Sequence, residues 1–269
     1  MAGLSPPQSH LLSVERLSKS FGGIQALTDY GLSLNQGELF GLIGPNGAGK
    51  TTVFNLLSGV LRPSSGRIFF SGQDISSNRP YQNARLGLSR TFQNIRLFND
   101  LSVEDNVKAA FHMHLGTGFW TTVLHLPGFM RSERDITRQA TECLHLLELD
   151  QYRQDKAGNL PFGLQRKVEI ARSLATSPKL LLLDEPAAGM NPHETEELME
   201  TIQSIHRQYK LTICLVEHDM SVVMGICPRI QVLDQGRVLM EGTPREIQND
   251  PRVIKAYLGA PREEVHAEH

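Results

Sequence analysis

Apolar runs separated by turn residues predict β-strands near the N-terminus of the chain. We expect these strands at residues 11–17, 31–35, 38–43 and 67–71. The turns between them lie at 22–23, 36–37 and 63–66. Two later apolar runs, at 179–183 and 211–217, have the continuous hydrophobicity typical of parallel strands buried on both faces. The pattern therefore predicts an α/β core.

A helical pattern replaces the strand pattern between about residues 100 and 160. In the segment 132–149, apolar side chains recur every three to four residues, at Ile136, Ala140, Leu144 and Leu147. We interpret this stretch as a helical lobe inserted into the α/β core.

Residues 39–52 combine a buried strand, a glycine-rich turn and the start of a helix. The glycines let the backbone bend sharply and point several N–H groups at a phosphate chain on the helix N-terminus. Lys50 can reach the outer phosphates, and the Thr51 hydroxyl can ligand Mg²⁺. A chance match in a glycine-rich loop is the alternative, which the preceding strand makes rarer. The motif predicts binding of ATP or GTP through Gly44, Pro45, Asn46, Gly47, Ala48, Gly49, Lys50, Thr51 and Thr52.

Two adjacent acids, Asp184 and Glu185, follow the apolar run at 180–183. Open α/β sheets bind ligands at the carboxyl ends of their strands, so both acids are expected at the ligand edge. Asp184 would hold Mg²⁺, directly or through water, and Glu185 would polarise a water that attacks the terminal phosphate. A solvated acidic turn is the alternative interpretation, and the phosphate loop elsewhere in the chain weakens it.

His218 ends a second apolar run and is expected at the same edge of the sheet. At that position its ring could contact the γ-phosphate. A histidine at a strand end is, taken alone, more often a hydrogen-bonded structural residue. The two preceding motifs favour the catalytic interpretation.

The composition excludes several classes of protein. With 269 residues the chain can form one sizeable core, or one core with a smaller lobe. Its net charge of −2 gives no electrostatic reason to bind nucleic acid. The first ten residues contain no Lys, Arg or apolar run, so we expect neither a secretory signal nor a membrane anchor there. No later stretch has the length and apolarity of a membrane span.

The three cysteines, Cys143, Cys214 and Cys227, show no C-x-x-C spacing and have apolar neighbours. This is typical of reduced thiols in an intracellular protein. We expect all three in or near the core.

The chain resembles ABC ATPases over residues 12–242, because Phe21, the 44–52 loop, Gln93, the acidic strand end and His218 occur in that family's order. The resemblance implies one ABC ATPase domain with a C-terminal tail at 243–269. It also implies a P-loop NTPase core with an antiparallel β subdomain, made of residues 1–94 and 176–269, and a helical subdomain at 95–175.

The same resemblance assigns roles to single residues. Phe21 would stack on adenine, and Gln93 would contact Mg²⁺ or water and sense a membrane partner. Taken alone, a residue like Phe21 is more often a packing residue and one like Gln93 more often a polar loop residue. The implied catalytic residues are Glu185, His218 and Gln93, and the implied Mg²⁺ ligands are Thr51, Gln93 and Asp184.

More specific segments resemble the ATP-binding subunits of bacterial branched-chain amino-acid importers, at 90–98, 184–192, 217–220 and 256–259. The resemblance implies a peripheral ATPase at the cytoplasmic face of the inner membrane. Its partners would be a second ATPase subunit, identical or different, integral membrane permease subunits and, indirectly, a periplasmic solute-binding protein. Urea or short-amide importers of the same branch stay open, as does a soluble ABC ATPase without a transporter. A nucleotide-dependent kinase would need an acceptor lid that the sequence does not indicate.

The family's signature, usually Leu-Ser-Gly-Gly-Gln, is altered to Leu160, Pro161, Phe162, Gly163 and Leu164. In the family the signature of one cassette closes over ATP held by the other. Pro161 cannot donate the hydroxyl hydrogen bond of the missing serine, although proline suits a first helical turn. The hypothesis is an asymmetric pair of sites in a heterodimer. Alternatively, this branch of the family tolerates the altered signature, because backbone donors and Gly163 suffice for its function. Asn191 also departs from the usual aspartate.

Two weaker features complete the sequence. His112 and His114 have no neighbouring ligand cluster, so a metal site is not favoured. An apolar patch at Phe92, Ile95, Leu97 and Phe98 could receive a short helix of a membrane subunit, or belong to the core.

Overall fold

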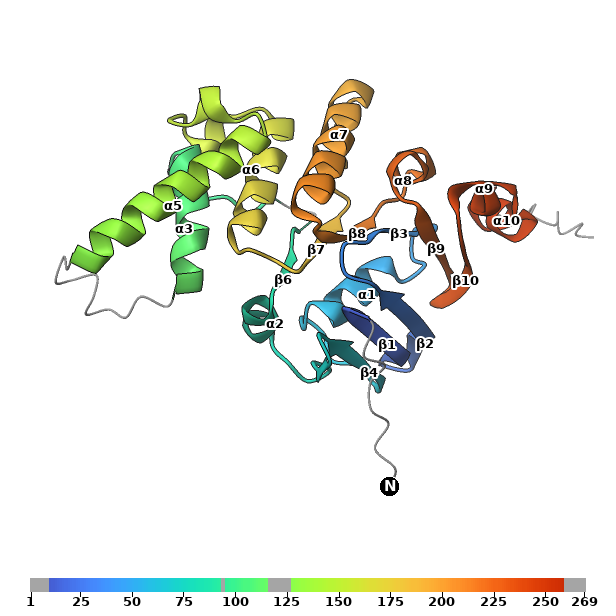
Figure 1. Ribbon diagram of the computed structural model, residues 1–269. Helices are drawn as coiled ribbons and strands as arrows, with labels where there is room; N and C mark the ends of the chain where they lie inside the picture. The colour runs from blue at the N-terminus through green and yellow to red at the C-terminus, as the bar shows by residue number, and fades with distance from the viewer. Residues whose placement is uncertain (1–9, 93–94, 116–126, 259–269) are drawn as a thin grey trace, which may run out of the picture.

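The computed structural model describes residues 10–92, 95–115 and 127–258, and for 112–115, 127–134 and 258 the backbone alone (Figure 1). The strands are β1 (Leu12–Phe21), β2 (Ile24–Leu34), β3 (Leu39–Ile43), β4 (Ser65–Phe70), β5 (Gln73–Asp74), β6 (Leu88–Arg90), β7 (Leu180–Asp184), β8 (Thr212–Val216), β9 (Arg229–Asp234) and β10 (Arg237–Gly242). The helices are α1 (Lys50–Leu57), α2 (Pro80–Leu86), α3 (Val103–Leu115), α5 (Pro127–Leu146), α6 (Phe162–Ala175), α7 (Pro192–Tyr209), α8 (Met220–Ile226), α9 (Pro244–Asn249) and α10 (Pro251–Leu258), with 3₁₀ turns at Asp150–Tyr152 and Ala157–Asn159.

A six-stranded sheet, in the order β10-β9-β3-β8-β7-β6, forms the centre of the molecule. Its strands from β9 to β6 are parallel, and β10 pairs antiparallel with β9 at one edge. The apolar run of β7 supplies both faces of this sheet, because Leu181 and Leu183 join one hydrophobic cluster and Leu180 and Leu182 join the other. This double burial explains why the run is continuously hydrophobic.

A second sheet, in the order β2-β1-β4-β5, is antiparallel and packs with α1 below the central sheet (Figure 1). Leu12 and Leu17 of β1 share a buried cluster with Phe54 of α1. This sheet therefore supports the helix that follows the glycine-rich loop.

The helices α3, α5 and α6 pack against one another at one side of the molecule, far from the antiparallel sheet in Figure 1. Four apolar positions of the predicted helical segment are all buried, at Ile136, Ala140, Leu144 and Leu147. The predicted helix is therefore confirmed, although α5 begins before residue 132. The same hydrophobic cluster continues from these helices to β7 and α7, so the helices and the sheet share one core.

The predicted strands are confirmed with modest shifts in their ends. The largest difference is in β2, which begins at Ile24 rather than near residue 31. Ile24 and Gln25 are both exposed, so the start of this strand has no apolar alternation to detect. The three cysteines are free and buried, as predicted. Within the described residues, no helix is both long and apolar enough to cross a membrane.

Gly41, in the middle of β3, allows α8 to pack closely on the sheet. A Cβ at this position would lie 2.2 Å from Cγ1 of Val223 and 3.3 Å from Sγ of Cys227. We therefore expect Gly41→Ala to lower the free energy of unfolding by about 1–3 kcal/mol, through overpacking. Urea unfolding followed by circular dichroism measures this change.

Gly225→Ala is the matched control, because Gly225 lies in α8 itself and a Cβ there would meet nothing within 4 Å. Alanine at a helical position with free space should stabilise the protein by about 0.5–1 kcal/mol. Equal unfolding midpoints for the two variants would contradict the proposed packing of Gly41.

Candidate functional site

The glycine-rich loop joins the end of β3 to the start of α1, as the sequence predicts. A Cβ on Gly44 would lie 2.2 Å from the Leu233 carbonyl oxygen, and one on Gly49 would lie 2.9 Å from that of Ala26. Gly47 has open space around it but adopts a φ of +81°, which favours glycine. Close packing and backbone conformation therefore both require glycine in this loop.

Lys50 folds back onto the loop. Its Nζ donates to the carbonyl oxygens of Gly44 (2.6 Å) and Pro45 (3.1 Å). Burial lowers the pKa of this ammonium, and the carboxylates of Glu185, Asp184 and Glu217 act in the opposite direction. The side chain is therefore a buried cation held at the loop by weak carbonyl partners, which an anion with more charge can replace.

A hollow of 190 Å³ brings the loop and one of the two acids together. Its lining residues are Asn46, Gly47, Ala48, Gly49, Lys50, Thr51, Thr52 and Glu185. The N-terminus of α1 opens into this loop, so backbone N–H groups, a helix dipole and one ammonium all favour a negatively charged ligand there. The cradle fits a chain of phosphates.

Glu185 directly follows β7, and its backbone N–H donates to the carbonyl oxygen of Val216 at the end of β8 (2.9 Å). Its φ of +46° is left-handed, which is uncommon for a residue with a side chain. The strained backbone turns the carboxylate toward the hollow that it lines. The carboxylate at the strand end therefore lies beside the loop, as predicted.

Asp184 is buried and paired with Arg90, a residue of β6 that sequence reasoning did not select. Arg90 donates to Oδ2 of Asp184 (2.6 Å) through one terminal nitrogen. Through the other it donates to Oδ1 of Asn55 on α1 (2.8 Å) and to Oγ of Ser58, the residue that caps the end of α1 (2.9 Å). The guanidinium therefore links the acidic strand end to the helix of the phosphate loop.

His218 lies beside Glu185 at the same edge of the sheet, as predicted. It also lies next to a second acid, Glu217, which the sequence analysis did not place there. Its Nδ1 is 3.9 Å from Oε2 of Glu185 and 3.6 Å from Oε2 of Glu217. Burial raises the pKa of Glu217 to about 6. Sequence reasoning missed Glu217 as a separate group, although its place directly after an apolar strand was a usable signal.

Two predicted site residues, Phe21 and Gln93, are not among the described residues that line the hollow. Phe21 lies at the end of β1 and is 44% exposed, and Nζ of Lys19 is 5.0 Å from the centroid of its ring. Gln93 lies outside the described residues. The neighbouring Phe92 is held at both backbone groups, since its carbonyl accepts from Arg166 (2.7 Å) and its N–H donates to Glu169 (3.3 Å), both on α6.

The altered signature forms the start of α6, and none of its described residues lines the hollow. Pro161 is the N-cap, and no side chain caps this helix end. Phe162 is 46% exposed, and its ring lies 3.6 Å from where a Cβ on Gly189 would be. The signature therefore lies outside the hollow at the chain's own phosphate loop.

Asn191 has a local structural role. Its side chain accepts from the Glu194 N–H (3.0 Å), and the Glu194 carboxylate accepts from the Asn191 N–H (3.0 Å). This capping box at the start of α7 explains an asparagine at this position.

Tyr257 of α10 contributes a further residue that the sequence did not predict. Its buried hydroxyl has no hydrogen bond of ordinary geometry to a described residue, and it faces the Gly44 backbone. Burial raises the pKa of this phenol to about 12. The C-terminal helix therefore brings one side chain to the backbone at the start of the phosphate loop.

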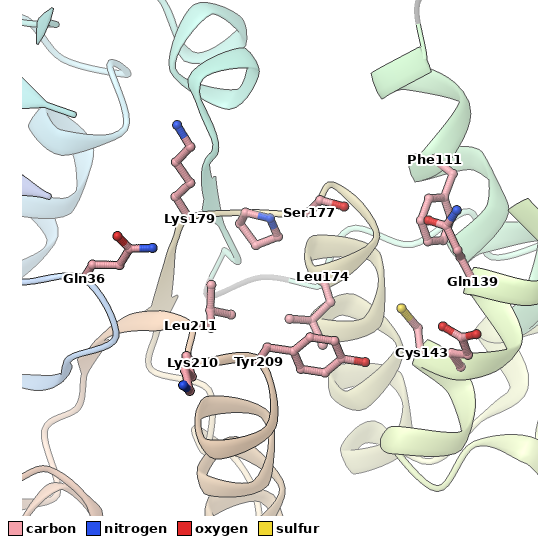
Figure 2. A pocket seen from close by; sticks show the side chains of 12 residues that line it. Gln36, Phe111, Gln139, Cys143, Leu174, Ser177, Lys179, Tyr209, Lys210 and Leu211 are labelled. Atoms are coloured by element: carbon pink, nitrogen blue, oxygen red, sulfur yellow. The ribbon is translucent and has the colours of Figure 1, made fainter.

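A larger cavity of 320 Å³ lies between α5, the end of α6 and the end of α7. Figure 2 shows the Tyr209 ring of α7 pointing toward Cys143 of α5. Lys179 and Leu211, which also line it, directly precede β7 and β8, so this cavity lies at the amino edge of the sheet. The phosphate loop lies at the opposite edge. Among the described residues, no group of three or more His, Cys, Asp or Glu side chains could hold a metal ion.

Comparisons with known proteins agree with this geometry. The family model described as ABC transporter matches residues 27–188, and the model described as branched-chain amino acid ATP-binding cassette transporter matches residues 237–263. The chain is 46% identical to the high-affinity branched-chain amino acid transport ATP-binding protein LivG of Escherichia coli (strain K12) and 43% identical to BraF, the protein of the same description from Pseudomonas aeruginosa. Both alignments cover 93% of this chain and 98% of the relative.

A solved structure is similar over the same length. It is the ADP conformation of an ATP-binding cassette from an ABC transporter, with a TM-score of 0.81 and 28% identity, covering 93% of this chain and 99% of that chain. The phosphate loop, the acidic strand end and the full-length similarity agree, and the chain therefore belongs to the ABC transporter family, as one of its ATP-binding cassette ATPases.

Proposed function

We propose that this chain is the ATP-hydrolysing subunit of an importer for branched-chain amino acids, which it powers through separate membrane subunits. The observation that carries the proposal is the hollow in which residues 46–52 and Glu185 meet. The substrate class is supported by the match of residues 237–263 to the branched-chain model and by the relatives' names. The chain itself would not touch the amino acid.

In this proposal the residues around the hollow divide the chemistry. The loop N–H groups and Lys50 bind the phosphates, and Glu185 orients and deprotonates the attacking water. His218 would contact the γ-phosphate from the neighbouring strand, and Phe21 would stack on adenine. Gln93 would contact the attacking water or the metal.

The residues predicted to hold Mg²⁺ fit a hard cation, because the Thr51 hydroxyl and the Asp184 carboxylate supply oxygen ligands near the loop. Arg90 donates a hydrogen bond to Oδ2 of Asp184. When bound, Mg²⁺ would neutralise negative charge on the phosphates. Asp184 could contact the bound Mg²⁺ directly or through a water molecule, and both are compatible with this arrangement.

The proposed unit of hydrolysis is a pair of cassettes. The signature residues 160–164 lie outside the chain's own hollow, which supports a role on the ATP of a second cassette, identical or different. The proposed division is a core of residues 1–94 and 176–269 and a helical subdomain at 95–175.

Restoring serine at position 161 tests the altered signature. Pro161→Ser should add the missing cap at α6, worth about 1 kcal/mol of stability, and raise ATP turnover when the chain pairs with itself. The turnover gain follows because the hydroxyl would donate to the partner's γ-phosphate. A coupled phosphate-release assay on the purified chain measures it.

Pro161→Ala is the matched control, since it removes the proline ring without adding a hydroxyl. An unchanged rate in Pro161→Ser would refute the idea that the signature limits turnover. It would favour the alternative in which backbone donors and Gly163 suffice.

The proposed partners and location follow from the transporter role: integral permease subunits, a periplasmic solute-binding protein acting through them, and the cytoplasmic face of the inner membrane. ATP turnover should rise strongly when candidate permease subunits and a second cassette are added to the chain. In cells, deleting the gene should abolish uptake of labelled leucine but not of labelled urea. Loss of urea uptake instead would favour the related urea or short-amide importer.

A further inference from the structure

Glu217 is a buried carboxylate at the functional edge of the sheet. It directly follows β8 and is only 1% exposed. Burying a carboxylate costs free energy unless its oxygens are well partnered, and an apolar residue would continue this strand at no such cost. The raised pKa of Glu217 agrees with that cost.

The Glu217 carboxylate is hydrogen-bonded to the turn that follows Glu185. Oε1 of Glu217 accepts a hydrogen bond from the backbone N–H of Ala187 (2.9 Å). One residue earlier in β8, the Val216 carbonyl accepts from the N–H of Glu185 (2.9 Å). Val216, the last residue of β8, and Glu217, the next residue, therefore hydrogen-bond the backbone of this turn at two residues, Glu185 and Ala187.

Glu185 needs such support. Its left-handed backbone, with φ of +46°, is unfavourable for a residue with a side chain, by about 1–2 kcal/mol. The Ala188 N–H closes the same turn on the Glu185 carbonyl at 3.2 Å, a long hydrogen bond. The hydrogen bond from Ala187 to Glu217 is shorter than this one, so it is the stronger restraint on the turn that follows Glu185.

The other oxygen of Glu217 faces His218. Nδ1 of His218 is 3.6 Å from Oε2 of Glu217 and 3.9 Å from Oε2 of Glu185. The imidazole, whose side chain is 55% exposed, therefore lies between a buried and a partly exposed carboxylate. The buried one has a fixed position, so it can define where the ring lies.

We propose that Glu217 is a positioning residue for ATP hydrolysis, which holds the backbone of Glu185 in its left-handed conformation and His218 beside it. This inference rests on the proposed roles of Glu185 and His218. It predicts that loss of the Glu217 oxygens affects the chemical step and not the binding of ATP, because the phosphates are bound by the loop.

The test compares Glu217→Val and Glu217→Gln in the full-length chain. Valine suits the end of a buried strand but offers no acceptor, whereas the glutamine Oε1 can still accept from the Ala187 N–H. We expect Glu217→Val to lower kcat about tenfold or more, because small misplacements of reacting groups are costly. The Kd of a fluorescent ATP analogue and the KM for ATP should stay within about twofold of wild type. Glu217→Gln should recover most of the turnover.

Several results would overturn the inference: normal kcat in Glu217→Val, a parallel loss of ATP binding in that variant, or a glutamine variant as slow as the valine variant. The proposed function is tested separately by Glu185→Gln in the same assay. Normal hydrolysis in Glu185→Gln refutes the role of Glu185 itself. If Glu185→Gln does not hydrolyse ATP while Glu217→Val is fully active, only the proposed role of Glu217 is refuted.

Discussion

Replacing Glu185 by glutamine is expected to lower ATP turnover by about 10²- to 10⁴-fold, the usual contribution of a general base. The amide has nearly the same shape but cannot take a proton from water. ATP binding should be retained, because in the proposed site the loop and Lys50, rather than this carboxylate, bind the phosphates. A phosphate-release assay and an equilibrium binding assay with a fluorescent ATP analogue separate the two effects.

Glu200→Gln is a suitable control, since Glu200 is exposed on α7 away from the hollow. It should leave both turnover and binding unchanged. Normal turnover in Glu185→Gln would remove Glu185 from the mechanism.

Replacing Arg90 by methionine should lower the free energy of unfolding by about 3–5 kcal/mol, the usual cost of breaking a buried ion pair from one side. Asp184 would be left as a buried charge without its guanidinium, and Asn55 and Ser58 would each lose a donor. Urea unfolding followed by fluorescence or circular dichroism measures the change.

Two comparisons make this experiment specific. Arg138→Met removes two exposed ion pairs on α5, with Asp135 and Glu142, and should cost less than about 1 kcal/mol. Adding Asp184→Asn to Arg90→Met should recover part of the lost stability, because the stranded charge is gone. If Arg90→Met unfolded at the wild-type urea concentration, the pair with Asp184 would not be a stabilising element.

The parts of the site that the sequence predicted are those encoded locally. The phosphate loop is contiguous, with its glycines, Lys50 and Thr51 within a few residues, so spacing alone identifies it. Glu185 and His218 could be predicted because each follows an uninterrupted apolar strand, and parallel strands end at one edge.

The parts that sequence reasoning missed depend on contacts between distant segments. Arg90 is one arginine in a three-residue strand, and its partner Asp184 is 94 positions away in the sequence. Tyr257 belongs to a helix near the end of the chain, yet its hydroxyl faces Gly44. No local periodicity reports either contact, because only the packing of the whole fold creates it.

The position of β3 inside the central sheet has a consequence for how the chain is made. Its two neighbours are β8 and β9, whose last residue, Asp234, is about 190 positions beyond Ile43. At about 5–20 residues per second, a ribosome needs roughly 10–40 s to synthesise that interval. Throughout this time the apolar strand that carries the phosphate loop lacks both of its neighbours in the sheet, so the nascent chain exposes an aggregation-prone segment until β9 has been synthesised.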